Sequence, residues 1–104
     1  MSRSSTTIER AGPLRPVHPG RLLAGEMEAR GLSALALSLH LRVPANRISE
    51  IVKGRRAISA ETALRLGRYF KTGPELWLRL QASYDLAVAE KKHGAEIRKE
   101  VRAA

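Results

Sequence analysis

The sequence predicts an all-α fold, and three observations support this prediction. The 104-residue chain has one Phe, one Trp and two Tyr, so its core must be built from Leu, Ile, Val and Ala, a set that suits helices. Apolar residues recur at spacings of three and four through most of the chain. Ser, Pro and Gly, which begin or end helices, separate these stretches. A chain of this length is expected to form one domain.

The N-terminal region is predicted to hold an arm and then a first helix. Residues 1–17 are rich in Ser, Thr, Arg, Pro and Gly, so we expect a flexible arm. The folded domain is predicted over residues 18–92. Its first helix follows "HPG" at residues 18–20 and is expected to end at Gly31, because glycine is a typical C-terminal stop.

The next stretch, "ALALSLHLRV" at residues 34–43, is ambiguous. Leucine falls on every second position, a pattern typical of a half-buried strand. However, Leu and Ala favour helix, and Ser33 can cap one. We therefore predict a short helix over 33–41, with Ala34, Leu37, Ser38 and Leu41 on one face. Leu35 and Leu39 then lie on another side, where a neighbouring segment, the arm or a partner would cover them.

Two further helices are predicted from their starts and stops. Pro44 can begin a helix but not continue one, and Gly54 is expected to end it. The apolar residues of this helix form one inward stripe, and its polar residues point the opposite way. Ser59 is expected to cap the following helix, which runs to Phe70.

The last helix is expected to be long. Thr72 and Glu75 have the spacing of a capping box, with Pro74 in the first turn. The helix is predicted to run to about Lys92, where Gly94 would break it. Residues 93–104 are then expected to form a charged C-terminal tail or a short extra helix.

Positive charge gathers in one segment. The net charge is +9 and the isoelectric point about 11.1. Residues 42–71 hold eight basic residues against Glu50 and Glu61, a net charge of +6 (8 − 2). The basic residues are Arg42, Arg47, Lys53, Arg55, Arg56, Arg65, Arg68 and Lys71. A nucleic-acid partner explains such a cluster better than a basic surface kept for solubility.

Other classes of function are disfavoured. The chain has no cysteine, and His18, His40 and His93 are scattered, so we expect no metal site and no disulfide. With a single aspartate, Asp85, and no glycine-rich phosphate loop, we expect no enzyme, no cofactor and no small-molecule substrate. No apolar run approaches the roughly 20 residues of a membrane span, and no signal peptide is recognisable. We therefore expect a cytoplasmic protein without membrane contact.

The two short helices expected at 33–41 and 44–53 match a helix-turn-helix. In this motif the second helix enters the major groove and reads base edges with its outer face, while the first helix lies across the DNA backbone. A small residue is needed where the helices cross, and Ser38 satisfies this requirement.

Residues 18–89 resemble HigA-type antitoxins, the Xre-like helix-turn-helix proteins of host-inhibition-of-growth toxin–antitoxin modules. The resemblance lies in "HPGRLL", "GLS", "VPANRISEIVKGRRAISAETALRLGRYF" and "TGPELWLRLQASYDLAVA". It implies a five-helix bundle of the phage-repressor-like type and a homodimer. It also implies double-stranded operator DNA with inverted half-sites, and a RelE-like (HigB-type) mRNA-endonuclease toxin as partner.

The resemblance also assigns DNA-contacting residues. The implied base-reading residues are Ala45, Asn46, Arg47, Ser49 and Glu50. The implied phosphate contacts are Ser33, Arg42, Lys53, Arg55 and Arg56. Asn46 suits adenine and Arg47 guanine, while Glu50 would accept from cytosine or orient Arg47. The alternative is an ordinary solvated surface for Asn46, Arg47, Arg55 and Arg56. For Glu50 it is a structural clamp or a group that repels wrong sequences.

The sequence departs from the family pattern in two places. Arg42 replaces the usual glycine of the turn, where a positive φ costs a non-glycine residue about 1 kcal/mol. Either the turn is slightly altered, or Arg42 tolerates the strain and adds a phosphate contact. Ala34 replaces a frequent glutamine, which removes one expected contact with the DNA backbone.

Partner surfaces follow from surplus apolar and acidic residues. The last helix has more apolar positions than one packing face needs, so we expect the dimer contact there. The expected dimer residues are Leu76, Trp77, Leu80, Tyr84 and Val88. Toxins of this class are basic, so the toxin contact is expected at acidic or apolar residues. The candidates are Glu26, Glu28, Leu35 and Leu39, together with the arm.

Two other interpretations remain open. A stand-alone Xre-type transcriptional regulator would have the same domain and no toxin. A basic RNA- or ribosome-associated module would need exposed aromatic residues to stack on bases, and this chain has few.

Overall fold

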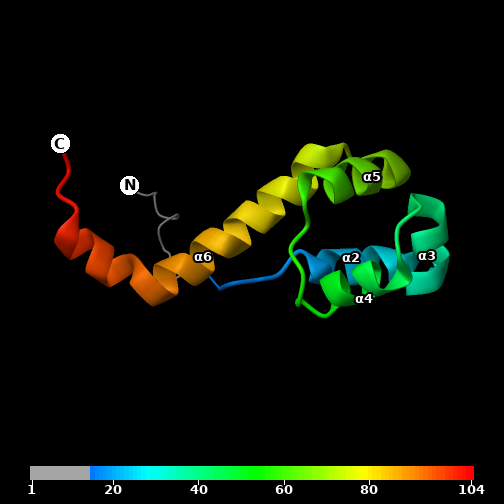
Figure 1. The fold of residues 1–104 in the computed structure, drawn as a ribbon, viewed down its shortest axis with the longest axis horizontal. Coiled ribbons are helices and arrows are strands. Elements are labelled where there is room, and N and C mark those ends of the chain that lie inside the picture. The colour runs from blue at the N-terminus through cyan, green and yellow to red at the C-terminus, as the bar shows by residue number, and fades with distance from the viewer. Residues whose placement is uncertain (1–14) are drawn as a thin grey trace, which may run out of the picture.

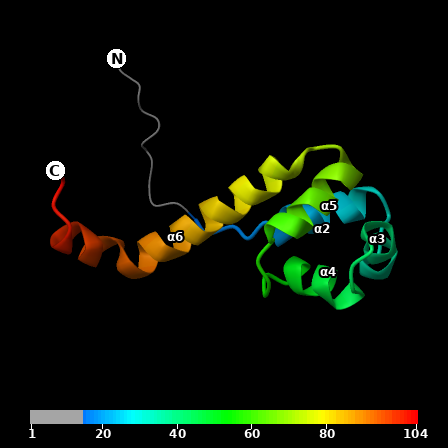
Figure 2. The same cartoon turned by 45° about the horizontal axis from the view of Figure 1, so that its top comes forward.

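The computed structural model describes residues 15–104, which are helical and contain no strand (Figures 1 and 2). The helices are α2 (Gly20–Ala29), α3 (Ala34–Leu41), α4 (Ala45–Val52), α5 (Ala60–Phe70) and α6 (Pro74–Glu100). The all-α prediction is confirmed, and "ALALSLHL" is a helix. The predicted arm falls largely outside the described residues. None of the described helices is long and apolar enough to cross a membrane.

One apolar core joins all five helices. Each contributes at least one buried side chain, and the linker between α4 and α5 contributes Ile58. The core consists of Leu23, Met27, Leu37, Leu41, Ile48, Ile51, Ile58, Ala63, Leu66, Phe70 and Trp77. Helix α6 packs along α5 with its first half, and its second half extends away from the other helices (Figures 1 and 2).

Serine caps begin two of the helices as predicted. The Ser33 hydroxyl accepts a hydrogen bond from the Ala36 backbone N–H at 3.0 Å, at the start of α3. The Ser59 hydroxyl accepts from the Thr62 N–H at 3.2 Å, at the start of α5. Each cap satisfies a backbone donor that the helix itself leaves unpaired, which fixes where α3 and α5 begin.

The turn between α3 and α4 has the left-handed conformation that glycine adopts most easily, although its residue is Arg42. Arg42 has φ 60° and ψ 49°, in the left-handed region, and the Val43 N–H donates to the Ser38 carbonyl at 3.1 Å. Ser38 is buried, so the two helices approach closely here, as its small size predicts. Arg42 therefore adopts the positive φ expected at this position, at the cost of backbone strain.

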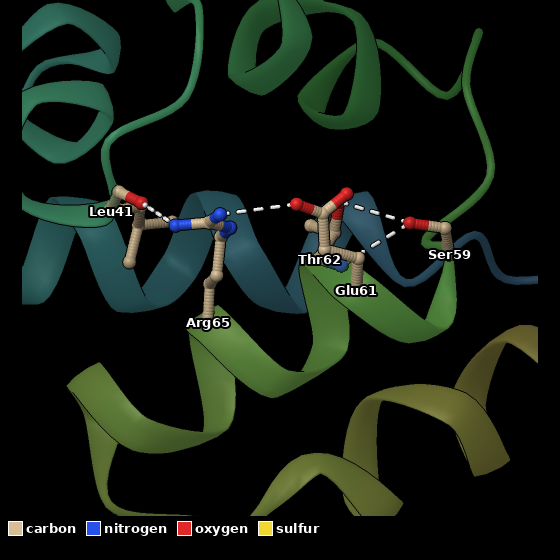
Figure 3. A network of polar contacts seen from close by, with 5 residues as sticks. All are labelled: Leu41, Ser59, Glu61, Thr62 and Arg65. Carbon is tan, nitrogen blue, oxygen red and sulfur yellow. Dashed lines mark hydrogen bonds and ion pairs between the residues drawn. The ribbon is translucent and has the colours of Figure 1, made fainter.

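A polar contact ties α5 to the end of α3, just before this turn. Arg65 Nη1 donates to the Leu41 carbonyl at 2.9 Å, and Nη2 to Glu61 Oε2 at 3.1 Å (Figure 3). The Leu41 carbonyl is among those that the end of a helix leaves without an internal partner. Arg65 therefore closes the end of α3 and fixes it against α5.

The predicted capping box at the start of α6 is wrong. The N-cap residue is Gly73, and no side chain caps the helix. The Thr72 hydroxyl instead accepts a hydrogen bond from the Trp77 indole N–H at 3.0 Å. Because Trp77 is completely buried, its N–H needs an internal acceptor, and Thr72 supplies it.

The predicted end of α6 near Lys92 is also wrong, because the helix continues through Gly94 to Glu100. Arg98 Nη1 pairs with Glu90 Oε2 at 2.6 Å, two turns apart, and these side chains pass over Gly94, which is buried. A glycine inside a helix costs only about 1 kcal/mol relative to alanine, which flanking helix formers can offset. Residues 93–100 are thus part of α6, and only residues 101–104 form a tail.

We predict opposite stability effects for two glycine substitutions. Gly67 lies where α5 meets the start of α6, and a Cβ there would overlap the backbone of Gly73 and Pro74. Gly67→Ala is therefore expected to lower the free energy of unfolding by roughly 1–3 kcal/mol through overpacking. Gly25→Ala in α2 is the matched control, since its added Cβ meets no atom within 4 Å. It should raise stability by roughly 0.5–1 kcal/mol.

Urea unfolding of both variants measures these effects. A Gly67→Ala variant as stable as the wild type would contradict the tight crossing of α5 and α6.

Candidate nucleic-acid interface

Helix α4 has one buried face and one outward face. Ile48 and Ile51 are completely buried, and α4 packs against α2 and α3. On the other side Asn46 is exposed, and the remaining predicted base-reading residues are partly exposed: Ala45, Arg47, Ser49 and Glu50. The apolar stripe therefore seats the helix, and all five predicted residues reach the surface.

Two of these side chains are engaged within the protein. The Ser49 hydroxyl donates to the Ala45 carbonyl at 3.3 Å. Glu50 Oε1 accepts from Arg56 Nε at 2.8 Å, and both side chains remain more than two-fifths exposed. The sequence analysis gave the orientation of Arg47 as one role for Glu50. In the structure, the Glu50 carboxylate pairs with Arg56 instead. This leaves Asn46 and Arg47 as the chief residues predicted to recognise base edges.

Basic side chains flank α4 at both ends. Arg42 precedes the helix, and Lys53, Arg55 and Arg56 follow it, all of them exposed. Within residues 15–104, a carboxylate lies within ion-pair distance of Arg56 but not of Arg42, Lys53 or Arg55. The uncompensated cations on either side of the outward face can attract an external anion such as phosphate.

Ser33 is exposed at the N-terminus of α3. Its hydroxyl is occupied as the acceptor in the helix cap. The first backbone N–H groups of an α-helix have no internal partner and favour an anion. A phosphate contact at this predicted position would therefore use the backbone of α3 as well as the Ser33 side chain.

The linker between α4 and α5, residues 53–59, is fixed at both ends. Near α4, the Arg55 N–H donates to the Glu50 carbonyl at 2.8 Å. Near α5, Ile58 is buried and its N–H donates to Gln81 Oε1 at 2.8 Å. The sequence analysis did not identify Gln81. A polar residue one turn after Trp77, on the buried side of α6, was the signal that could have revealed it.

His18 is a second residue that sequence reasoning left without a role. Its Nδ1 accepts from the Gly20 N–H at 2.9 Å, at the start of α2. Its ring meets that of Tyr84 edge-on, with centroids 4.9 Å apart, and lies beside Gly54 of the linker. His18 therefore contacts the start of α2, the linker between α4 and α5, and α6.

The residues predicted for the dimer contact differ in their solvent exposure. Trp77 is completely buried in its own subunit's core, so its assignment to a dimer surface is wrong. Leu80 is partly buried against that core, while Tyr84 and Val88 are half-buried and Leu76 is 36% exposed. Leu86, one turn before Glu90, is 69% exposed. The apolar surface available on α6 therefore centres on its middle turns.

The candidate toxin contacts differ in the same way. Glu26 is paired with Arg30, one turn later in α2, which neutralises its charge locally. Glu28 is exposed. Leu35 and Leu39 are 61% and 70% exposed, so nothing among residues 15–104 covers them. Two leucines one turn apart on α3 thus form an apolar patch on the surface.

Comparison with known proteins supports the helix-turn-helix assignment of α3 and α4. A family model described as "Helix-turn-helix" matches residues 23–77, which span α2 to the start of α6. The chain is 49% identical over 75 residues to virulence-associated protein I of Dichelobacter nodosus, covering 71% of this chain and 69% of that protein.

Two solved structures share the fold closely. An addiction module antidote protein of the HigA family from Coxiella burnetii is 48% identical, with a TM-score of 0.85, over 88% of this chain and 100% of that one. The Pseudomonas aeruginosa antitoxin HigA, solved with the higBA promoter, is 42% identical, with a TM-score of 0.82, over 85% and 97%. The chain therefore belongs to the helix-turn-helix family, and within it to the Xre-like, HigA-type antitoxins.

Proposed function

We propose that this protein is an antitoxin that binds operator DNA as a homodimer, represses its own operon and neutralises a RelE-like (HigB-type) mRNA-endonuclease toxin by direct binding. The observation that carries the proposal is helix α4, which has a buried apolar face and an outward polar face. At both of its ends lie cations that pair with no carboxylate of residues 15–104. The HigA-family relative solved with promoter DNA supports the same interpretation.

The dimensions of α4 suit the major groove. An α-helix with its side chains is about 10–12 Å across, and the major groove is about 12 Å wide. Asn46 offers a donor and an acceptor to adenine, and Arg47 offers two donors to guanine. Arg42 and the linker cations would hold phosphates on either side and so fix the register of the helix.

Dimerisation follows from the small footprint of one such helix. A single α4 covers too few base pairs for useful specificity, whereas two copies read half-sites about 34–36 Å apart or a multiple of that spacing. We place the two-fold contact on the middle of α6, where Leu86 is the most exposed large apolar residue of the described chain after Leu39.

The toxin contact is proposed on α3. Leu35 and Leu39 form an uncovered apolar patch on a surface otherwise rich in positive charge. Desolvating two leucines attracts a basic toxin without requiring opposite charge, which a +9 chain offers at few places. Glu28 on α2 is a further candidate, since it is exposed and acidic.

Substitutions in α4 and in the turn should affect DNA binding differently. Asn46→Ala and Arg47→Ala are each expected to weaken operator binding by about 1–3 kcal/mol and to leave non-specific binding nearly unchanged. Arg42→Gly should weaken binding to both DNAs and lower the salt slope by about 1, while thermal stability rises because the left-handed strain is relieved.

Salt titration of binding to the gene's own upstream DNA, beside an unrelated duplex, makes this comparison. Binding that does not depend on salt, or an equal loss on both DNAs for Asn46→Ala, would contradict the proposed reading of bases by α4.

The dimer prediction concerns Leu86. Leu86→Glu is expected to shift the protein from dimer to monomer at micromolar concentration, because the two-fold contact would bring two carboxylates into an apolar interface. Leu64→Glu serves as the control, since Leu64 is 60% exposed and lies on α5 rather than on α6. Sedimentation velocity measures the outcome, and a monomeric wild type would refute the proposed contact.

The toxin prediction concerns the leucine patch. Leu35→Lys combined with Leu39→Lys is expected to lower affinity for the toxin by at least tenfold, since it removes apolar burial and adds like charge. Glu28→Lys tests the second candidate separately. Calorimetry with the product of the adjacent toxin gene measures both. A wild type that binds no such product would leave a stand-alone Xre-type regulator as the function.

A further inference from the structure

Gln81 connects α6 to the linker that carries Arg55 and Arg56. Its side chain is 7% exposed, and it spans the gap between α6 and Ile58. We propose that the buried amide of Gln81 is a positioning group that sets the linker for phosphate contact, so that α6 controls the strength of DNA binding without touching DNA. The inference rests on the proposed function, because it takes Arg55 and Arg56 as phosphate contacts.

The hydrogen bond at Ile58 is the first part of this device. The Ile58 N–H donates to Gln81 Oε1 at 2.8 Å, and the Ile58 side chain is only 3% exposed. A buried N–H requires an acceptor, and in the described chain Gln81 provides it. Without that acceptor, the linker would have to move outward to bring the N–H to water.

Asp85 orients the amide of Gln81. Gln81 Nε2 donates to Asp85 Oδ1 at 3.1 Å, one turn later on α6. An ionised carboxylate can only accept hydrogen bonds, so it selects the NH₂ end of the amide and turns the carbonyl end toward Ile58. Asp85 is exposed and adjacent to Leu86, so the hydrogen-bonded chain begins at the surface of α6 where we place the dimer contact.

Arg55 and Arg56 lie between two points at which hydrogen bonds hold the linker. On the α4 side, the Arg55 N–H donates to the Glu50 carbonyl and the Arg56 side chain pairs with the Glu50 carboxylate. On the α5 side, Ile58 is held by Gln81. Only Ala57 separates Arg56 from Ile58, in the green segment between α4 and α5 of Figure 1. A displacement at Ile58 therefore moves both guanidinium groups relative to α4.

The test is the salt dependence of DNA binding by Gln81→Met, which keeps the side-chain length and removes the hydrogen-bonding groups. Using the DNA upstream of the gene, we expect the slope of log K against log salt to become shallower by about 1.8, since each phosphate contact contributes roughly 0.9. Between 50 and 200 mM salt, the wild-type affinity should then fall roughly twelvefold more than that of the variant. Gln81→Glu combined with Asp85→Asn, which keeps an acceptor for the Ile58 N–H and a donor facing residue 81, should restore most of the slope.

Two controls separate positioning from lost stability. Phe70→Leu, in the last turn of α5, lowers the melting temperature through the core and should leave the slope unchanged. In an Arg55→Ala plus Arg56→Ala background, Gln81→Met should change the slope no further. Should Gln81→Met fail to fold, Asp85→Ala at the exposed end of the device should still make the slope shallower.

The possible outcomes are distinct. The positioning role would be overturned if Gln81→Met kept the wild-type slope. It would also be overturned if Gln81→Met changed the slope further in the background that lacks Arg55 and Arg56. A wild-type protein that does not bind the upstream DNA would refute the proposed function itself, and the inference with it.

Discussion

Arg42 turns the chain between α3 and α4 in a left-handed backbone conformation, and the direction of α4 depends on that turn. The strain of about 1 kcal/mol is offset by contacts that hold the turn from both sides. Arg65 closes the last carbonyl of α3, and the buried Ser38 lets the two helices meet closely. With the angle fixed, Ile48 and Ile51 enter the core and the polar residues of α4 face outward. The candidate DNA surface is thus a consequence of core packing.

Helix α6 has a different role along each part of its length. Trp77 completes the core, and its indole N–H uses the Thr72 hydroxyl as acceptor. One turn later, Gln81 carries a polar contact to the linker. After the buried Ala87 and the half-buried Val88, the helix extends away from the other helices as a charged segment, in which the Glu90–Arg98 pair bridges the buried Gly94. A single helix therefore joins the core, the linker and the apolar surface available to a second subunit.

The distribution of ion pairs is what leaves charge available around α4. Among the described residues, carboxylates partner Arg30, Arg56, Arg65 and Arg98. These pairs are largely exposed and contribute little to stability. Their main effect is electrostatic, since they offset positive charge at those four positions and leave the cations immediately before and after α4 uncompensated.

The sequence by itself determined the features that depend on near neighbours in the chain. The helix over "ALALSLHL", the serine caps and the inward stripe of α4 all follow from chemistry within about four residues. Tertiary structure decided which of several available partners each side chain takes: Arg56 for Glu50, Trp77 for Thr72, and Ile58 for Gln81. Such partners lie up to 23 residues apart in the chain, and only the packing of whole helices brings them within hydrogen-bond distance.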